Sequence, residues 1–283
     1  MKALRSDLRT GRFWRWFFIN ALAAVGTLVT GIELVNFFWS GKVVAAAPWL
    51  FPAIVAGSAV FGLWRAWPRP IRQTYSSPST TIHLKEGDLF AQEGHVVVGA
   101  CDTFDTAFPF IAKTSVQGQF LDKVFQGDAA ELDLQLKAAL SSDRPIGRVT
   151  KPGKNDRYEI GTVATLRGDG KKFFLVAYTE MNERNEARGT VDGIWKSLSN
   201  LWSEVRAQSN GGVVCIPIIG GGQSRISQIL PIQDSVRFVI LSFMLASRQE
   251  KVCDELRIVA RPGEYGRLDR LELQAFLSSL RAS

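Results

Sequence analysis

One stretch of the chain decides the fold class, VVCIPIIGGGQSRI at residues 213–226. Its first part, residues 213–219, is a fully apolar run of the kind that forms a strand buried on both faces. Three consecutive glycines follow it at once, and the next helical pattern starts at Ile232. Strands buried on both faces occur in sheets that helices cover on each side. The stretch therefore predicts a three-layer α/β/α domain.

The segments around this stretch alternate in the same way. Period-2 or apolar runs predict strands at residues 81–85, 95–98, 159–166, 173–178 and 256–260, and helical periodicity predicts helices at 121–140, 191–208, 232–246 and 268–280. Prolines and serines mark residues 68–80 as a linker. We therefore expect three parts: residues 1–67, a linker at 68–80, and a ligand-binding α/β domain at 81–283.

Residues 1–67 carry two long apolar segments. Residues 16–39 contain a single charge, Glu33, and residues 43–64 contain none. At 1.5 Å per residue these helices would span about 36 and about 33 Å, enough for a hydrocarbon core of ~30 Å. Six of the eight tryptophans lie near their ends, as at membrane interfaces: Trp14, Trp16, Trp39, Trp49, Trp64 and Trp67. The sequence thus predicts a transmembrane hairpin.

Basic residues lie on the outer flanks of both segments, and only Lys42 lies in the turn between them. The positive-inside rule then predicts an inner-membrane protein with both termini and the α/β domain in the cytoplasm. A cleaved signal peptide is the competing interpretation, but the first segment is long for one and a second follows directly.

Glu33 lies inside the first apolar segment, on one helical stripe with Asn36. It could reach the outer headgroups or be protonated, or the stripe could line an assembly of several copies, because ionisable groups at depth usually face protein or water. We therefore treat Glu33 and Asn36 as candidate assembly residues.

Composition narrows the remaining function classes. The 34 Lys+Arg exceed the 27 Asp+Glu to give +7, but the excess lies largely at the membrane ends, so we expect no nucleic-acid partner. Three scattered cysteines form no disulfide framework and no zinc pair. Two histidines make a His-based triad or a multi-His metal site improbable, and we expect neither a metal nor a cofactor.

The glycine stretch has the chemistry of an anion site. In open α/β sheets, ligands bind beyond the carboxyl ends of strands, and glycine backbone N–H groups can close around a phosphate. The stretch lacks the Gly-Lys-Ser/Thr of a P-loop, and Arg225 breaks the dinucleotide pattern. An ordinary glycine turn remains the alternative. The candidate diphosphate-binding residues are Gly220, Gly221, Gly222, Gln223, Ser224 and Arg225.

Three motifs together resemble the macro domains of type II Thoeris antiphage effectors, which carry two N-terminal transmembrane helices. Pro217-x-x-Gly220-x-Gly222 resembles the second phosphate loop of macro domains, and Gly87-Asp88-Leu89 resembles the segment whose Asp binds the adenine amino group. Phe104-Asp105-Thr106 followed by Ser115-x-x-Gly118 resembles the ribose-facing loop of the effector group. The resemblance implies a mixed sheet and these further ligand-binding residues: Asp88, Leu89, Cys101, Asp102, Phe104, Ser115, Val116, Gln117 and Gly118.

The resemblance implies a receptor for an ADP-ribose derivative, histidine-ADP-ribose, which a TIR-domain partner makes from NAD. Binding would drive assembly into a tetramer or larger homo-oligomer, disrupt the lipid bilayer and cause abortive infection. Hydrolytic macro domains place Asn where this chain has Cys101 or Asp102, and Gln117 stands where the effector group has His. The alternatives are a membrane-tethered ADP-ribosyl hydrolase and a scaffold whose α/β domain binds no nucleotide.

Overall fold

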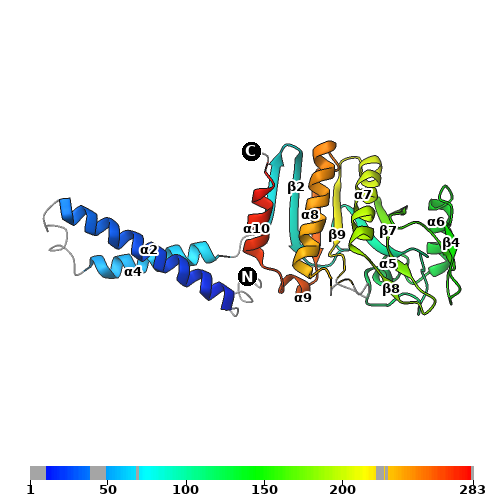
Figure 1. Ribbon diagram of the computed structural model, residues 1–283, viewed down its shortest axis with the longest axis horizontal. Helices are drawn as coiled ribbons and strands as arrows, with labels where there is room; N and C mark the ends of the chain where they lie inside the picture. Colours follow the sequence, from blue (N-terminus) through cyan, green and yellow to red (C-terminus); the bar gives the residue numbers. More distant parts are fainter. Residues whose placement is uncertain (1–10, 39–48, 68–69, 221–225, 227–228, 282–283) are drawn as a thin grey trace. The chain divides into compact units, whose positions relative to one another are not determined.

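The computed structural model describes residues 11–38, 49–67, 70–220, 226 and 229–281. The chain divides into two compact units, residues 1–69 and residues 70–283, which are described separately (Figure 1).

The first unit contains two helices that pack against each other, α2 (Gly11–Phe38) and α4 (Leu50–Ala66). They approach closely at Gly62, where an added Cβ would lie 3.0 Å from the Ala21 Cβ. Among the described residues, 13–38 form the one helix long and apolar enough to cross a membrane. The 17 residues of α4 extend about 26 Å, which is shorter than the expected second span. Residues 39–48, with the expected turn, lie outside the described residues.

The two candidate assembly residues of α2 differ in their surroundings. Glu33 is exposed, whereas Asn36 is half-buried and its Oδ1 is buried without a hydrogen-bond partner. The small residues at four-residue spacing, Ala23, Thr27 and Gly31, are also exposed. Packing of α2 on α4 therefore accounts for Gly62 but leaves Glu33 and this small-residue stripe uncovered within the unit.

The second unit is built on one mixed sheet with the order β1-β2-β10-β9-β3-β7-β6, with β8 pairing β7. Its centre is five parallel strands: β2 (Ser79–Glu86), β10 (Glu255–Ala260), β9 (Val213–Pro217), β3 (His95–Cys101) and β7 (Lys171–Met181). The remaining strands pair antiparallel: β1 (Ile71–Ser76), β6 (Val163–Gly168), β8 (Ala187–Arg188), and a separate pair of β4 (Gly147–Arg148) with β5 (Asp156–Arg157).

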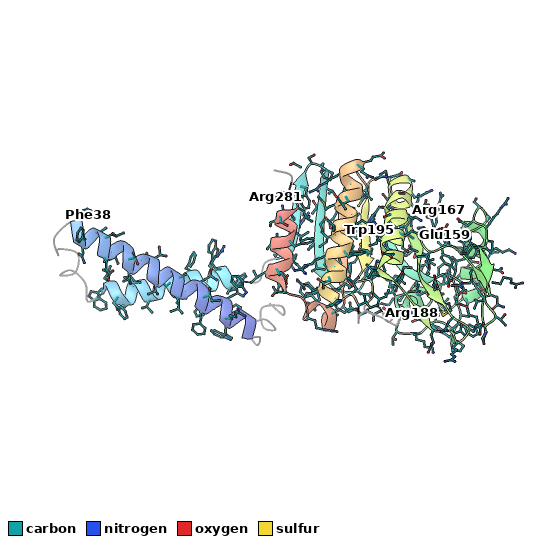
Figure 2. All side chains as sticks on the ribbon, in the orientation of Figure 1. Phe38, Glu159, Arg167, Arg188, Trp195 and Arg281 are labelled. Atoms are coloured by element: carbon teal, nitrogen blue, oxygen red, sulfur yellow. The ribbon has the colours of Figure 1, made fainter. Side chains whose placement is uncertain are left out.

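Helices cover both faces of this sheet. The larger core, which includes Trp202 and Phe243, lies under α7 (Val191–Gln208), α8 (Ile232–Gln249) and α10 (Arg270–Ser279). The second core, which includes Phe120 and Leu132, lies under α5 (Val116–Val124) and α6 (Ala129–Ala139). A short helix, α9 (Pro262–Tyr265), follows β10. Side chains fill the space between α7, α8 and the strands behind them (Figure 2). Every residue of both cores belongs to the second unit, so this unit holds a complete core of its own.

Three features differ from the sequence expectation. The strand expected at 159–166 starts later and is β6 at Val163–Gly168. Residues 68–80 do not form a linker throughout, because Ile71–Ser76 pair with β2 and the second unit begins at Pro70. The helix expected at 121–140 is two helices, because Gly127 has φ +84° and Asp128 caps a new helix by accepting from the N–H of Ala130 and Glu131.

Candidate functional site at the carboxyl ends of the strands

The five parallel strands end at one edge of the sheet. The residues that follow them are Gly87–Asp88 after β2, the loop before α5 after β3, and Ile218–Gly220 after β9. Because β10 alone lies between β2 and β9, the ends of these two strands are about 10 Å apart at ~4.8 Å per strand. Ligands of α/β sheets bind at such an edge. The structure therefore brings Asp88 and the start of the glycine stretch to neighbouring positions.

Asp88 presents an ionised carboxylate at this edge. Its Oδ1 accepts a hydrogen bond from the backbone N–H of Phe90 at 3.0 Å, and its Oδ2 lies 2.5 Å from the Nζ of Lys123 on α5. The Lys123 hydrogen bond is the main reason that the pKa of Asp88 lies below its ordinary value of 3.8. The Asp88 side chain is 44% exposed, so the carboxylate can still accept a hydrogen bond from a ligand. Leu89, in contrast, is buried in the second core.

The two residues at the end of β3 are buried inside the fold. Asp102 accepts a hydrogen bond from the backbone N–H of Met181 at 2.8 Å and one from the Nε of Arg157 at 2.6 Å. Burial raises the pKa of the Asp102 carboxyl despite these bonds. The Sγ of Cys101 lies 3.3 Å from the Thr103 Oγ1, and burial raises the thiol pKa. Both side chains therefore hold the β3 end in place within the protein.

Phe104 is also part of the fold. Its backbone has φ +48°, and its ring is 1% exposed and packs edge-on against Tyr158 with centroids 5.6 Å apart. A left-handed backbone is uncommon for an aromatic residue. The buried Phe104 ring therefore supports the conformation of the loop after β3.

The Ser115-x-x-Gly118 motif is a helix cap. The Ser115 Oγ accepts from the backbone N–H of Gly118 at 2.9 Å and donates to the carbonyl of Ala112 at 2.6 Å. A Cβ at Gly118 would lie 2.2 Å from that same carbonyl oxygen, so only glycine fits there. Gln117 is buried and donates to the backbone carbonyl of Asp105, while Val116 is half-buried. The spacing fixes the start of α5 beside the edge.

Asp105 lies at the centre of a buried network of hydrogen bonds. It belongs to the Phe104-Asp105-Thr106 motif but was not among the predicted ligand-binding residues. Its Oδ2 lies 2.7 Å from the Nζ of Lys151 and 2.5 Å from the Thr103 Oγ1, and its Oδ1 accepts from the backbone N–H of Lys154 at 2.8 Å. The Lys151 and Asp105 side chains are 0% and 1% exposed. The sequence signal for this network was the presence of two aspartates, Asp102 and Asp105, shortly after an apolar strand. Their cationic partners could not be predicted, because Lys151 lies 46 residues from Asp105 and Arg157 lies 55 residues from Asp102.

Gly220 opens the glycine stretch with φ +85°, a conformation that L side chains rarely adopt. A Cβ there would lie 3.3 Å from the Ile226 Cγ2, and Ile226 is buried in the larger core. The ends of the stretch are therefore anchored. Gly221, Gly222, Gln223, Ser224 and Arg225 lie outside the described residues, so their predicted role stays a prediction. Within the described residues, no group of three or more His, Cys, Asp or Glu side chains could hold a metal ion.

Comparison with known proteins agrees with this arrangement. The model of the family described as Thoeris protein ThsA, macro domain, matches residues 82–261. Thoeris protein ThsA of Bacillus amyloliquefaciens is 22% identical over 211 residues, which cover 72% of this chain and 70% of the relative.

Solved structures share the fold of the second unit. The Oceanobacillus iheyensis macrodomain with MES bound superposes with a TM-score of 0.52 at 11% identity, covering 75% of this chain and 99% of that one. A mutant of the same macrodomain with ADPR gives 0.50 at 12% identity, with 74% and 99% covered. The family model spans well over half of this chain, and the sheet and its edge have the expected form. The chain therefore belongs to the macro-domain family of Thoeris ThsA proteins.

Proposed function

We propose that this chain is an antiphage effector whose α/β domain binds an ADP-ribose derivative. The single observation that carries the proposal is the placement of Asp88 and Gly220 at neighbouring strand ends in a ThsA-family macro domain. The exposed, ionised Asp88 can accept hydrogen bonds from an adenine amino group. The glycine stretch can offer backbone N–H groups to the diphosphate. A macrodomain that shares this fold was solved in the presence of ADPR.

The chemistry at the end of β3 favours a receptor over a hydrolase. At the position where hydrolytic macro domains have Asn, Cys101 is a buried thiol of raised pKa and Asp102 is engaged by Arg157 and Met181. Neither side chain is placed to activate a water molecule on a ligand. We therefore propose binding without turnover, of a signal that a TIR-domain partner makes, with histidine-ADP-ribose as the favoured form.

Titration of residues 70–283 tests the ligand. The domain is mixed with ADP-ribose, histidine-ADP-ribose and NAD in a calorimeter, with size-exclusion chromatography in parallel. We expect tight binding of one ADP-ribose derivative, no product on incubation, and a larger species in its presence. Release of ADP-ribose from a modified substrate would establish the hydrolase instead. If none of the three ligands binds, the remaining hypothesis is a scaffold whose α/β domain binds no nucleotide.

We propose that ligand binding causes the apolar helices of several copies to assemble. A ligand shifts an equilibrium only if it binds the assembled state better than the resting one, and a ligand held between copies would do so. In this proposal α2 and α4 lie in the inner membrane with the domain in the cytoplasm. Two exposed parts of α2 are the surfaces on which copies would meet: the polar residue Glu33, and separately the small residues Ala23, Thr27 and Gly31, since small residues allow close helix approach in lipid.

Replacing Glu33 by alanine tests this surface. We expect the Glu33→Ala effector to bind its ligand normally but to kill infected cells less than the parent, because the polar contact between copies is lost. A Leu34→Ala variant, which changes an exposed neighbour without changing charge, is the control. Survival counts after infection measure the effect, and full killing by Glu33→Ala would remove Glu33 and its polar stripe with Asn36 from the mechanism.

A further inference from the structure

The second face of the sheet is left open at its β1 end. The two helices on that face, α5 and α6, pack on β3 and β6, whereas α8 and α10 lie over β9, β2 and β1 on the other face (Figure 1). β1 shows the consequence, since Ile71, Gln73 and Tyr75 are buried and Arg72 and Thr74 between them are exposed. Part of the sheet therefore presents side chains that no described helix covers.

The strand register gathers basic residues on this open face. Arg72 pairs with His83 of β2, and His83 pairs with Arg257 of β10, so the three form one row across neighbouring strands. Lys85 lies two residues beyond His83 and therefore on the same face. We call Arg72, His83, Lys85 and Arg257 the cationic face. These residues are spread over 186 positions of the sequence, and only the sheet brings them together.

The Glu255 carboxylate lies among these cations. Glu255 is 3.5 Å from the Arg72 guanidinium, 2.8 Å from that of Arg257 and 3.8 Å from the His83 Nδ1. It therefore neutralises one of the three permanent positive charges and leaves a surplus of two. Arg72 is 54% exposed, and Lys85 is an exposed residue whose Nζ donates to the Gln92 Oε1 at 3.0 Å, so both charges of the surplus are accessible from solvent. Burial and the neighbouring cations lower the pKa of His83, so it adds little charge at neutral pH.

We propose that the cationic face docks on the anionic headgroups of the membrane that holds α2. The claim rests on the membrane anchoring proposed above. Charge complementarity supports it, because basic residues at a membrane surface are attracted to anionic lipid by about 1 kcal/mol each, or about fivefold in affinity. Continuity of the chain supports it too, since four residues join α4 to β1 and Arg65 lies in the last turn of α4.

Docking would use a face of the sheet, whereas Asp88 and Gly220 follow the strand ends. Lys85 is the member of the cationic face that reaches toward this edge, because its Nζ donates to the Gln92 Oε1 at 3.0 Å and the Gln92 Nε2 donates to the carbonyl of Asp88 at 2.8 Å. A weak surface attraction is enough for a tethered domain, because the tether makes contact with the membrane an intramolecular event.

Vesicle flotation tests the docking. Residues 70–283, which hold both cores, are mixed at low salt with vesicles of phosphatidylglycerol and phosphatidylcholine in equal parts, and separately with pure phosphatidylcholine. We expect binding to the anionic vesicles alone, and loss of it as salt rises. The Arg72→Gln/Lys85→Gln variant should bind them about 25-fold more weakly, at about fivefold for each charge.

The control variant removes the same charge elsewhere. Lys137→Gln/Arg167→Gln neutralises two exposed cations on α6 and β6, and Arg167 lies at the opposite end of the sheet from β2 (Figure 2). Equal losses in the two variants, or binding to pure phosphatidylcholine, would overturn the proposal, as would self-association of the domain through this face without lipid. ADP-ribose titration of Arg72→Gln alone, which leaves the hydrogen bond between Lys85 and Gln92 in place, separates the outcomes, because weakened docking with intact nucleotide binding leaves the proposed receptor standing.

In the full chain, the same contact predicts protection of Lys85. Modification of Lys85 by an amine-reactive reagent should be slower in phosphatidylglycerol nanodiscs than in phosphatidylcholine nanodiscs. The exposed Lys137 serves as the internal reference, and equal rates for Lys85 in the two lipids would contradict docking.

Discussion

Replacing Lys151 by alanine is expected to lower the unfolding free energy of residues 70–283 by about 3–5 kcal/mol. Lys151 and Asp105 are almost wholly buried and their charged atoms are 2.7 Å apart. Removing the ammonium leaves the carboxylate buried with only uncharged donors beside it, a hydroxyl, a thiol and a backbone N–H, and an uncompensated buried charge is costly. Urea denaturation measures the loss, and the melting temperature should fall by roughly 10 °C for a domain of this size.

A surface ion pair provides the matched control for Lys151. Lys196 pairs with Glu159, but their side chains are 48% and 63% exposed. Lys196→Ala should therefore cost no more than about 1 kcal/mol. Adding Asp105→Asn to Lys151→Met should restore part of the stability, because the unpaired charge is then absent. If Lys151→Ala and Lys196→Ala proved equally mild, the buried pair would not be what holds the loop after β3.

Replacing Asp88 by asparagine is expected to weaken binding of an adenine-containing ligand by roughly 10- to 100-fold. Hydrogen bonds to charged groups contribute about 1.5–3 kcal/mol each, and the amide loses both the charge and the Lys123 contact. Calorimetric titration of residues 70–283 with ADP-ribose measures the change. Asp122→Asn, an exposed aspartate on α5, is the control with the same chemical change.

The pKa of Asp88 adds a pH expectation to this prediction. Since Lys123 holds that pKa below 3.8, the carboxylate stays ionised from pH 7 down to about pH 5. The contribution of Asp88 to ligand affinity should be constant over that range and decline only as the pH falls toward its lowered pKa. A decline between pH 7 and pH 6 that Asp88→Asn abolishes would show that the carboxylate titrates higher than its contacts imply.

Local patterns in the sequence were enough to identify much of this fold. The apolar run at 213–219 contains the central strand β9, which ends at Pro217, and the periodic stretch at 191–208 is α7 with the same bounds. The alternation of strands and helices, the glycine at position 220 and the position of Asp88 after a strand were all visible as short-range signals. Side chains repeat with a fixed period along a strand or a helix, and glycine readily adopts backbone angles that other residues avoid. Such features can therefore be predicted from residues that are close in sequence.

Tertiary structure decided what each polar side chain does. Asp88, Asp102 and Asp105 are the same residue type in neighbouring loops, yet one is exposed at the edge and two are buried against Arg157 and Lys151. The row that joins Arg72 to Arg257 also depends on a partner far along the chain, whereas β1 pairs with β2, the strand that directly follows it. The sequence by itself determined the elements and the strand ends where a ligand can bind. The fold decided which charges face that ligand, because burial and ion pairing are set by residues that meet only after the sheet has formed.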